Sequence, residues 1–155
     1  MTDGETIQGK FAIQKIYVKD VSLEAPATPH IFQEKWNPSV NMDLSNSVDK
    51  LSETLYEVTL SVTVTASAEE KTIYLIEVKQ AGIFFITDFS SEVITRMSAT
   101  ICPDILFPFA RETVSDMVAR AGFPQLLLAP VNFEVLYQQH QRQLAEQKAQ
   151  PVQKH

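Results

Sequence analysis

Few of the side chains in this 155-residue chain could act in catalysis, and they are scattered. The one cysteine, Cys102, stands directly before Pro103 at a predicted helix start, a position that can lower a thiol pKa. Cysteine is also among the most buried residue types, and no histidine–aspartate pair can be assigned to activate this one. The pattern therefore favours a packing role for Cys102 over a nucleophilic one.

Metal ligands and phosphate-binding loops are equally hard to find. The three histidines, His30, His140 and His155, lie far apart without ligand spacing. The four glycines are not clustered, so no Gly-rich phosphate loop can form. The carboxylates follow strand faces, with no pair spaced for acid–base work. The sequence favours a binding protein over an enzyme and predicts no metal site and no cofactor.

Composition narrows the class of partner. The net charge of −6 argues against a nucleic-acid partner, for which Lys and Arg supply most of the affinity, and suits a basic partner.

The N-terminal residues are polar, and no apolar run reaches the roughly 18–20 residues that span a bilayer. One cysteine excludes an internal disulfide. We expect a single domain over residues 1–155, in the reducing cytoplasm and without membrane insertion, with a disordered lead at about 1–9 and a mobile tail at about 149–155.

The stretch from residue 54 to 86 organises the predicted sheet. Its first half alternates with a period of two, and after a polar break at 68–71 a second apolar run follows. Two such runs joined by a short loop predict an antiparallel hairpin. The second run is apolar on both faces, interrupted by Glu77 and Lys79, so it needs cover on both sides.

Two further strands precede the hairpin. Residues 11–25 predict one long strand, in which Phe11, Ile13, Tyr17 and Val21 share a phase and Ile16 and Val18 indicate an irregularity. Residues 26–38 carry three prolines and predict an ordered loop, where Phe32 and Trp36 either seal the core or serve recognition. Residues 39–45 predict a short edge strand. Four strands in sequence predict an antiparallel meander.

Helices follow the sheet. Residues 87–101 form a transition with some helix-like spacing, and a helix follows with Pro103 and Pro108 in its first turn. Its apolar stripe runs from Ala110 to Ala121, and Gly122 ends it. Asn132 caps a final amphipathic helix. The chain therefore has more apolar surface than one small core needs, which favours oligomerisation and binding of apolar segments.

Four motifs, in order, make the chain similar to a known family. They are KIYVKDVSLEAP-x-x-PHIFQ-x-x-W at 15–36, YEV-x-L-x-VTVTAS at 56–67, CP-x-ILFP-x-ARE at 102–112 and FPQL-x-LAPVNFE at 123–134. The chain resembles SecB, the bacterial protein-export chaperone family, from Phe11 to about Tyr137. The resemblance implies an α+β fold, a four-stranded antiparallel sheet with two main helices packed on one face, assembled as a homotetramer that is a dimer of dimers.

The resemblance also implies a function. Family members are ATP-independent holdases that keep unfolded secretory precursor proteins translocation-competent and deliver them to SecA, the translocation ATPase. A general cytoplasmic holdase not coupled to export is the alternative. A small-ligand module or a Cys102 enzyme would bind neither unfolded chains nor SecA.

Site residues carry over by position. The SecA-binding surface falls on Asp20, Glu24, Leu75 and Glu77, which replaces the simpler interpretation of Asp20 and Glu24 as a solvated strand face. Tetramer assembly involves Ile76, Val78 and Gln80 together with the helix after Cys102. The chain departs from many relatives in its weakly acidic tail, which leaves the sheet as the expected main dock for SecA. The client-peptide groove is placed on Phe32, Trp36, Val40, Met42, Leu44, Ile83 and Tyr137.

Overall fold

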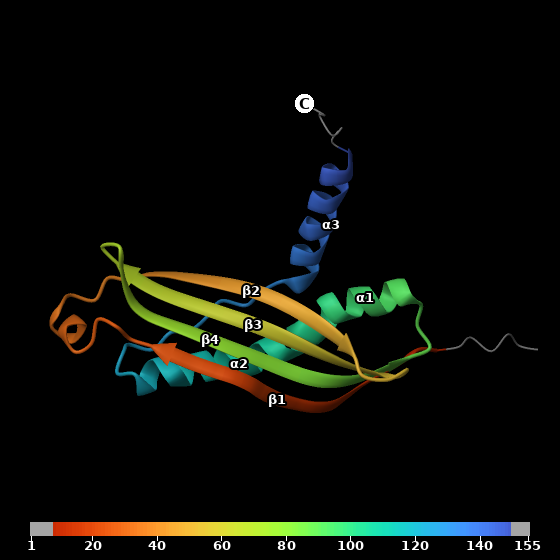
Figure 1. Cartoon of the computed structure of the whole chain (residues 1–155), viewed down its shortest axis with the longest axis horizontal. Helices are drawn as coiled ribbons and strands as arrows, with labels where there is room; N and C mark the ends of the chain where they lie inside the picture. The colour runs from red at the N-terminus through yellow and green to blue at the C-terminus, as the bar shows by residue number, and fades with distance from the viewer. Residues whose placement is uncertain (1–7, 150–155) are drawn as a thin grey trace, which may run out of the picture.

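Four long antiparallel strands form one sheet in the computed structural model, which describes residues 8–149 (Figure 1). The spatial order of the strands is β1-β4-β3-β2. The elements, in chain order, are β1 (Lys10–Glu24), the short 3₁₀ turn η1 (His30–Gln33), β2 (Ser39–Lys50), β3 (Leu55–Ala68), β4 (Lys71–Thr87), α1 (Ser91–Ala99), α2 (Ile101–Arg120) and α3 (Phe133–Ala149).

The predicted four-stranded antiparallel sheet is confirmed, but the meander connectivity is wrong. Strand β1 pairs with β4, so the crossover loop, residues 25–38, passes around one end of the sheet to reach β2 on the opposite edge (Figure 1). Three hairpin-connected strands with another strand returned beside them make a Greek key. Alternation tells which face a side chain occupies but not which strand lies beside it, so the sequence pattern could not separate the two topologies.

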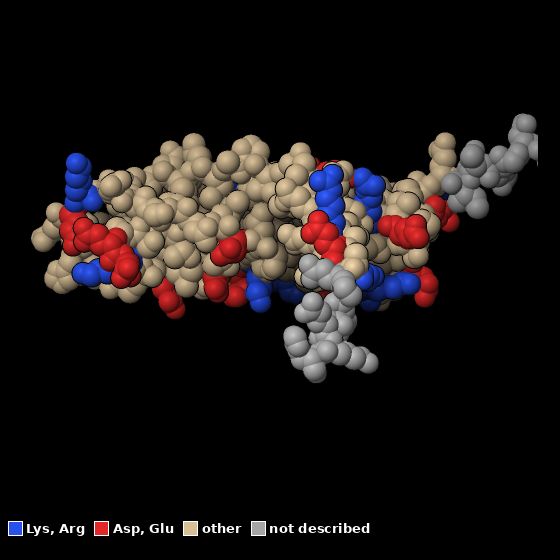
Figure 2. Space-filling view, turned by 90° about the horizontal axis from the view of Figure 1, so that it is seen from above, with Lys and Arg blue, Asp and Glu red and all other residues tan. Residues whose placement is uncertain are grey.

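The sheet has one apolar and one polar face, as the period of two predicts. The inner face, which packs against α2, holds fully buried side chains such as Val58, Leu60 and Ile76. Edge strand β2 is longer than predicted, and its inward-facing Val40 and Val48 remain exposed. Seen from above, the surface between the two ends of the molecule is mostly uncharged (Figure 2).

Strand β1 contains two β-bulges, where one extra residue interrupts the pairing with β4: at Gln14 and at Lys19. Each bulge inverts the alternation, because the side-chain period of a strand is two residues. Ile16 and Val18 therefore join Phe11 and Ile13 on the inner face, while Tyr17 turns outward. The predicted irregularity is confirmed, and the assignment of Tyr17 to the inner phase is wrong.

Helix α2 is the principal cover of the sheet, with the predicted stripe through Ala110, Val114 and Val118 fully buried. Pro103 lies in the first turn of α2, but Pro108 lies inside the helix, because it follows Pro103 by five residues, more than one helical turn. The transition before it contains α1, whose N-cap Ser90 accepts a hydrogen bond from the amide of Val93.

The predicted packing of two main helices on one face of the sheet is wrong for α3. Asn132 caps this helix as predicted, accepting from the amide of Val135 at 3.1 Å. Its first turn packs on α1 and α2 through Phe133, which contacts Phe107 edge-to-face. The rest of the helix stands away from the sheet (Figure 1). An amphipathic pattern predicts a helix but leaves its direction open.

The helical stretch Ser91–Arg120 is long and apolar enough to cross a membrane by length and composition alone. Of its most apolar window, however, 44% is buried within the protein. The backbone also leaves helical geometry at Thr100, with φ −124° and ψ −69°, which divides the stretch into α1 and α2. These are the features of a helix that packs on a sheet. The predicted lead and tail lie mainly outside the described residues.

The turn between β3 and β4 offers a test of backbone strain. Glu69 and Glu70 both have positive φ, 50° and 65°, a conformation that suits Asn-Gly far better. We expect the double substitution Glu69→Asn with Glu70→Gly to stabilise the protein by about 1–2 kcal/mol, measured by thermal unfolding at fixed protein concentration. Glu53→Gly, in the preceding hairpin turn between β2 and β3, where no residue has a positive φ, is the control and should not stabilise the protein. A fall in stability of the double variant would contradict the strain argument.

Candidate functional site

The outer face of the sheet carries an acidic patch built from Asp20, Glu24, Leu75 and Glu77. Glu24 pairs with Leu75, and Asp20 lies four residues earlier on the same strand, opposite Lys79. Glu77 pairs with Ser22, which lies between the two β1 acids. The three carboxylates are exposed and Leu75 is half-buried. Residues more than fifty positions apart in the sequence thus form one solvent-facing surface on two adjacent strands.

Sequence reasoning missed one further acid in this row. Glu77 pairs with Thr63 on β3, and Thr63 pairs with the exposed Asp43 on β2. Asp43 therefore extends the row of Glu77 across the sheet on the same face. Its outward phase was visible in the alternation of residues 39–45, but its alignment with Glu77 depends on strand register, which that alternation does not fix.

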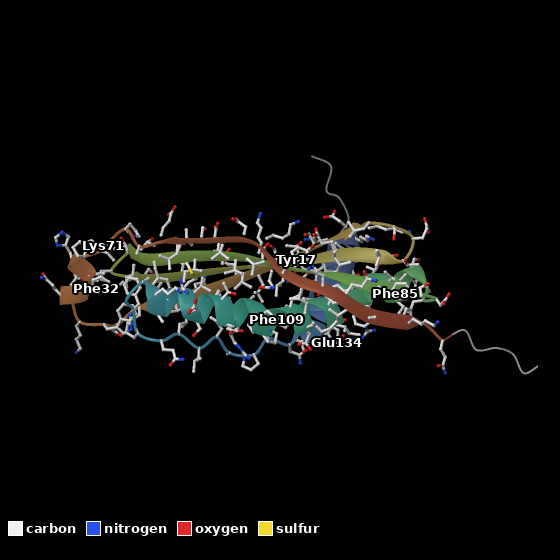
Figure 3. The ribbon with its side chains drawn as sticks, turned by 90° about the horizontal axis from the view of Figure 1, so that it is seen from below. Tyr17, Phe32, Lys71, Phe85, Phe109 and Glu134 are labelled. Carbon is white, nitrogen blue, oxygen red and sulfur yellow. The ribbon has the colours of Figure 1, made fainter. Side chains whose placement is uncertain are left out.

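An aromatic cluster occupies the end of the molecule where the crossover loop lies. Its centre is Phe123, which is 5% exposed. Phe32, Trp36 and Tyr74 surround it, with ring centroids at 5.3, 5.6 and 5.1 Å from its own. Tyr74 is buried, whereas Phe32 is 51% and Trp36 37% exposed. The cluster therefore runs from the core to the surface, and Figure 3 shows Phe32 at this end of the molecule, near Lys71 at the start of β4.

The aromatic cluster is compatible with both interpretations of Phe32 and Trp36, as residues that seal the core and as residues that serve recognition. These rings seal the core, because they cover Phe123, and they still present large apolar surface to solvent. Gly122 makes the arrangement possible: it ends α2 with φ +89°, and a Cβ on it would lie 3.3 Å from the ring of Phe32. Sequence reasoning did not single out Phe123, which sits in a connection without periodicity.

Edge strand β2 continues the apolar surface from the aromatic cluster. Val40 pairs with Ala66, which in turn pairs with Tyr74 of the cluster. Met42 and Leu44 follow on the same inner face and are half-buried. The structure therefore brings together five of the seven residues predicted for the client groove: Phe32, Trp36, Val40, Met42 and Leu44.

The other two predicted groove residues lie elsewhere. Ile83 is half-buried on the outer face, paired with Lys15 and Glu57, and so is on the opposite side of the sheet from Met42. Tyr137 lies on α3, where the guanidinium of Arg96 is 6.0 Å from its ring centroid. Neither residue contributes to the surface formed by the aromatic cluster and β2.

Cys102 is fully buried, and this burial raises the pKa of its thiol to about 12. The geometry supports the packing role. Within residues 8–149, no group of three or more His, Cys, Asp or Glu side chains could hold a metal ion.

We expect an aromatic disulfide reagent not to label Cys102 in the native protein at pH 8, because a buried thiol with so high a pKa forms almost no thiolate there. The same protein unfolded in urea, with an ordinary cysteine pKa of about 8.5, should react fully and serves as the control. Labelling of the native protein at the rate of the unfolded one would show that Cys102 is an accessible thiol.

Comparison with known proteins decides the family. A family model described as preprotein translocase subunit SecB matches residues 4–144. The chain belongs to the SecB family. The protein-export protein SecB of Methylococcus capsulatus is 53% identical over 146 residues, covering 94% of both chains. That of Nitrosococcus oceani is 52% identical, covering 88% of this chain and 84% of the relative. That of Chromobacterium violaceum is 51% identical, covering 94% and 97%.

A solved structure shares the SecB fold. It is the SecB-like chaperone of Mycobacterium tuberculosis in complex with a peptide from an antitoxin, with a TM-score of 0.67 and 19% identity. The match covers 79% of this chain and 91% of that one.

Within this SecB-family protein, the residues predicted for assembly lie in the protein's own core. Ile76 and Val78 are fully buried on the inner face, and Gln80 is 2% exposed. The side-chain amide of Gln80 donates to the carbonyl oxygen of Tyr17 at 3.1 Å. These three side chains are therefore not available for direct contact with another chain.

Proposed function

We propose that this SecB-family protein is an export chaperone: a nucleotide-independent holdase that binds unfolded precursor proteins and transfers them to SecA in the cytoplasm. The single observation that carries the proposal is the separation of two surfaces. The aromatic cluster and β2 present apolar side chains on the helix side of the sheet, while the acidic patch lies on the outer face. A subunit so arranged can hold a client and contact a basic partner at once.

The apolar surface suits clients of many sequences. Burial of apolar side chains is non-directional and contributes about 25 cal/mol per Å², so any extended segment with exposed apolar or aromatic residues can bind. Each segment binds weakly, and high affinity needs several sites on one long client. Selection then follows folding kinetics, because slow folders keep such segments exposed for longer.

Assembly as a homotetramer, a dimer of dimers, would supply that multiplicity. We assign Ile76, Val78 and Gln80 to positioning the elements that meet other subunits, and Ile83 and Tyr137 to client contacts made outside the main groove. The acidic patch, with Asp20, Glu24, Leu75 and Glu77, is assigned to SecA. Acid side chains on a solvent-facing surface steer a basic partner and give the complex its salt dependence.

A two-step titration tests the proposal. A urea-denatured secretory precursor is diluted into the purified protein, and complex mass is followed by light scattering; purified SecA is then added. Chaperoning for export requires suppressed aggregation without nucleotide, a free mass near four chains, and a further mass increase with SecA. A held precursor with no SecA association would instead support a general holdase, and an unsuppressed aggregate would exclude chaperone activity.

A further inference from the structure

Glu57 on β3 contacts two side chains of β1 across the intervening strand β4. Its carboxylate accepts hydrogen bonds from the hydroxyl of Tyr17 and, at 3.0 Å, from the ammonium of Lys19. Tyr17 can reach across β4 because its partner there is the small Ala81, which is fully buried although it faces outward. Tyr17 lies about midway along β1, on the outer side of the sheet (Figure 3).

The two residues that Glu57 holds lie next to a break in register. Val18 pairs with Gln80 and Asp20 pairs with Lys79, so Lys19 is the extra residue of the second bulge. Pairing resumes immediately, with Val21 opposite Val78. The apolar pattern requires an extra residue between Val18 and Val21, because without one Val21 would face outward and Asp20 inward.

That pattern does not decide which residue is the extra one. If Asp20 bulged instead of Lys19, the pairs Val18–Gln80 and Val21–Val78 would both be kept. Lys19 would then lie opposite Lys79, and the acidic patch would show an ammonium where it now shows a carboxylate. The two arrangements bury the same apolar side chains, so hydrophobic burial cannot choose between them.

We propose that Glu57 is a positioning residue that fixes the bulge at Lys19 and thereby displays Asp20 in the acidic patch. It binds the extra residue by its ammonium and the preceding outward residue, Tyr17, by its hydroxyl. The amide of Gln80 holds the carbonyl of Tyr17 as well. The pairing with Glu57 also neutralises the charge of Lys19, which directly precedes Asp20 in β1.

The ionisation states fit this role. The hydrogen bond from Tyr17, then that from Lys19, lowers the pKa of Glu57, so it is a carboxylate at neutral pH. Burial, with the bond to Glu57, raises the pKa of Tyr17 to about 12, which keeps the hydroxyl a donor. Glu57 is also well shielded, with its side chain 14% exposed against 42% for Lys19.

The test deletes the bulge. Removal of Lys19 leaves Val18 opposite Gln80 and Asp20 opposite Lys79 in a regular strand, so Glu57 has no bulge left to place. We expect Glu57→Ala to weaken SecA binding about fivefold in the full-length protein, the upper range for one surface ion pair. In the Lys19-deleted protein, Glu57→Ala should leave SecA binding unchanged. An equal loss in both backgrounds would assign Glu57 a merely structural role and overturn the proposal.

Two controls separate charge from position. Asp49→Ala removes an acid that pairs directly with Glu57 on the outer face and should leave SecA affinity within twofold of the original. Lys19→Gln keeps the extra residue without its ammonium, and should weaken SecA binding as Glu57→Ala does. Glu57→Gln keeps the side-chain size and should also weaken SecA binding. It replaces Glu57→Ala in the test if that variant folds poorly.

The inference rests on the proposed docking of SecA at the acidic patch, so a second readout is independent of SecA. Amide hydrogen exchange of residues 15–24 should accelerate in Glu57→Ala and not in the same variant lacking Lys19. Absence of SecA binding by the unmodified protein would refute the proposed function, while the exchange result would still decide the role of Glu57. Unchanged exchange in Glu57→Ala would refute that role.

Discussion

Phe123→Ala is expected to lower the free energy of unfolding by about 3–5 kcal/mol, the usual cost of removing a buried phenylalanine ring. Phe123 is 5% exposed and contacts three aromatic rings, so its removal leaves a cavity among them. Thermal unfolding at fixed protein concentration measures the loss. Gln125→Ala, an exposed change in the same connection, should stay within about 0.5 kcal/mol.

The same substitution should also weaken client binding below the melting temperature. Phe32 and Trp36 lie on Phe123, and without it they lose the support that holds them in an apolar surface. Trp36 is the single tryptophan of the chain, so its emission should shift to the red as the ring gains solvent. Unchanged Trp36 emission together with unchanged affinity for an unfolded client would show that Phe123 does not support the client-binding surface.

The sheet was predictable because its alternation is long and its faces differ. Residues 54–86 form the hairpin as predicted, and Glu77, which the family resemblance placed on the docking surface, faces solvent. Asp20 and Glu24 were likewise predicted on one face, and the structure brings them beside Leu75 and Glu77. A period of two carries this information locally, without knowledge of the neighbouring strand.

The predictions that failed depended on information that hydrophobic periodicity does not contain. The broken alternation at Ile16 and Val18 indicates an irregularity but not the residue at which each bulge falls, so Tyr17 was assigned to the wrong face. The pairing of β1 with β4 depends on the path of the crossover loop, and the direction of α3 depends on the short contact of Phe133 with Phe107. Phe123 was missed for a related reason: a connection without helix or strand period gives no sign of which side chain is buried.

Glu77→Lys is expected to weaken SecA binding by about tenfold to a hundredfold at low salt, because like charges brought together in an interface cost several kcal/mol. Glu77 is exposed and makes no ion pair within the described residues, so the fold should tolerate the change within about 0.5 kcal/mol. The loss should shrink as salt is added, since screening acts on exposed charges. Surface-immobilised SecA, with association rates measured over a salt series, provides the measurement.

The control for position is Glu53→Lys, which reverses an exposed charge in the turn between β2 and β3, at the other end of the sheet from the acidic patch. Both variants change the net charge equally, so a comparable loss in the two would mean that SecA responds to overall charge and not to the acidic patch. Suppression of precursor aggregation should be unchanged in Glu77→Lys, because the aromatic cluster and the apolar side chains of β2 lie on the opposite side of the sheet. A joint loss of SecA binding and aggregation suppression would contradict the separation of the two surfaces, since a charge on the outer face has no direct contact with Val40, Met42 or Leu44.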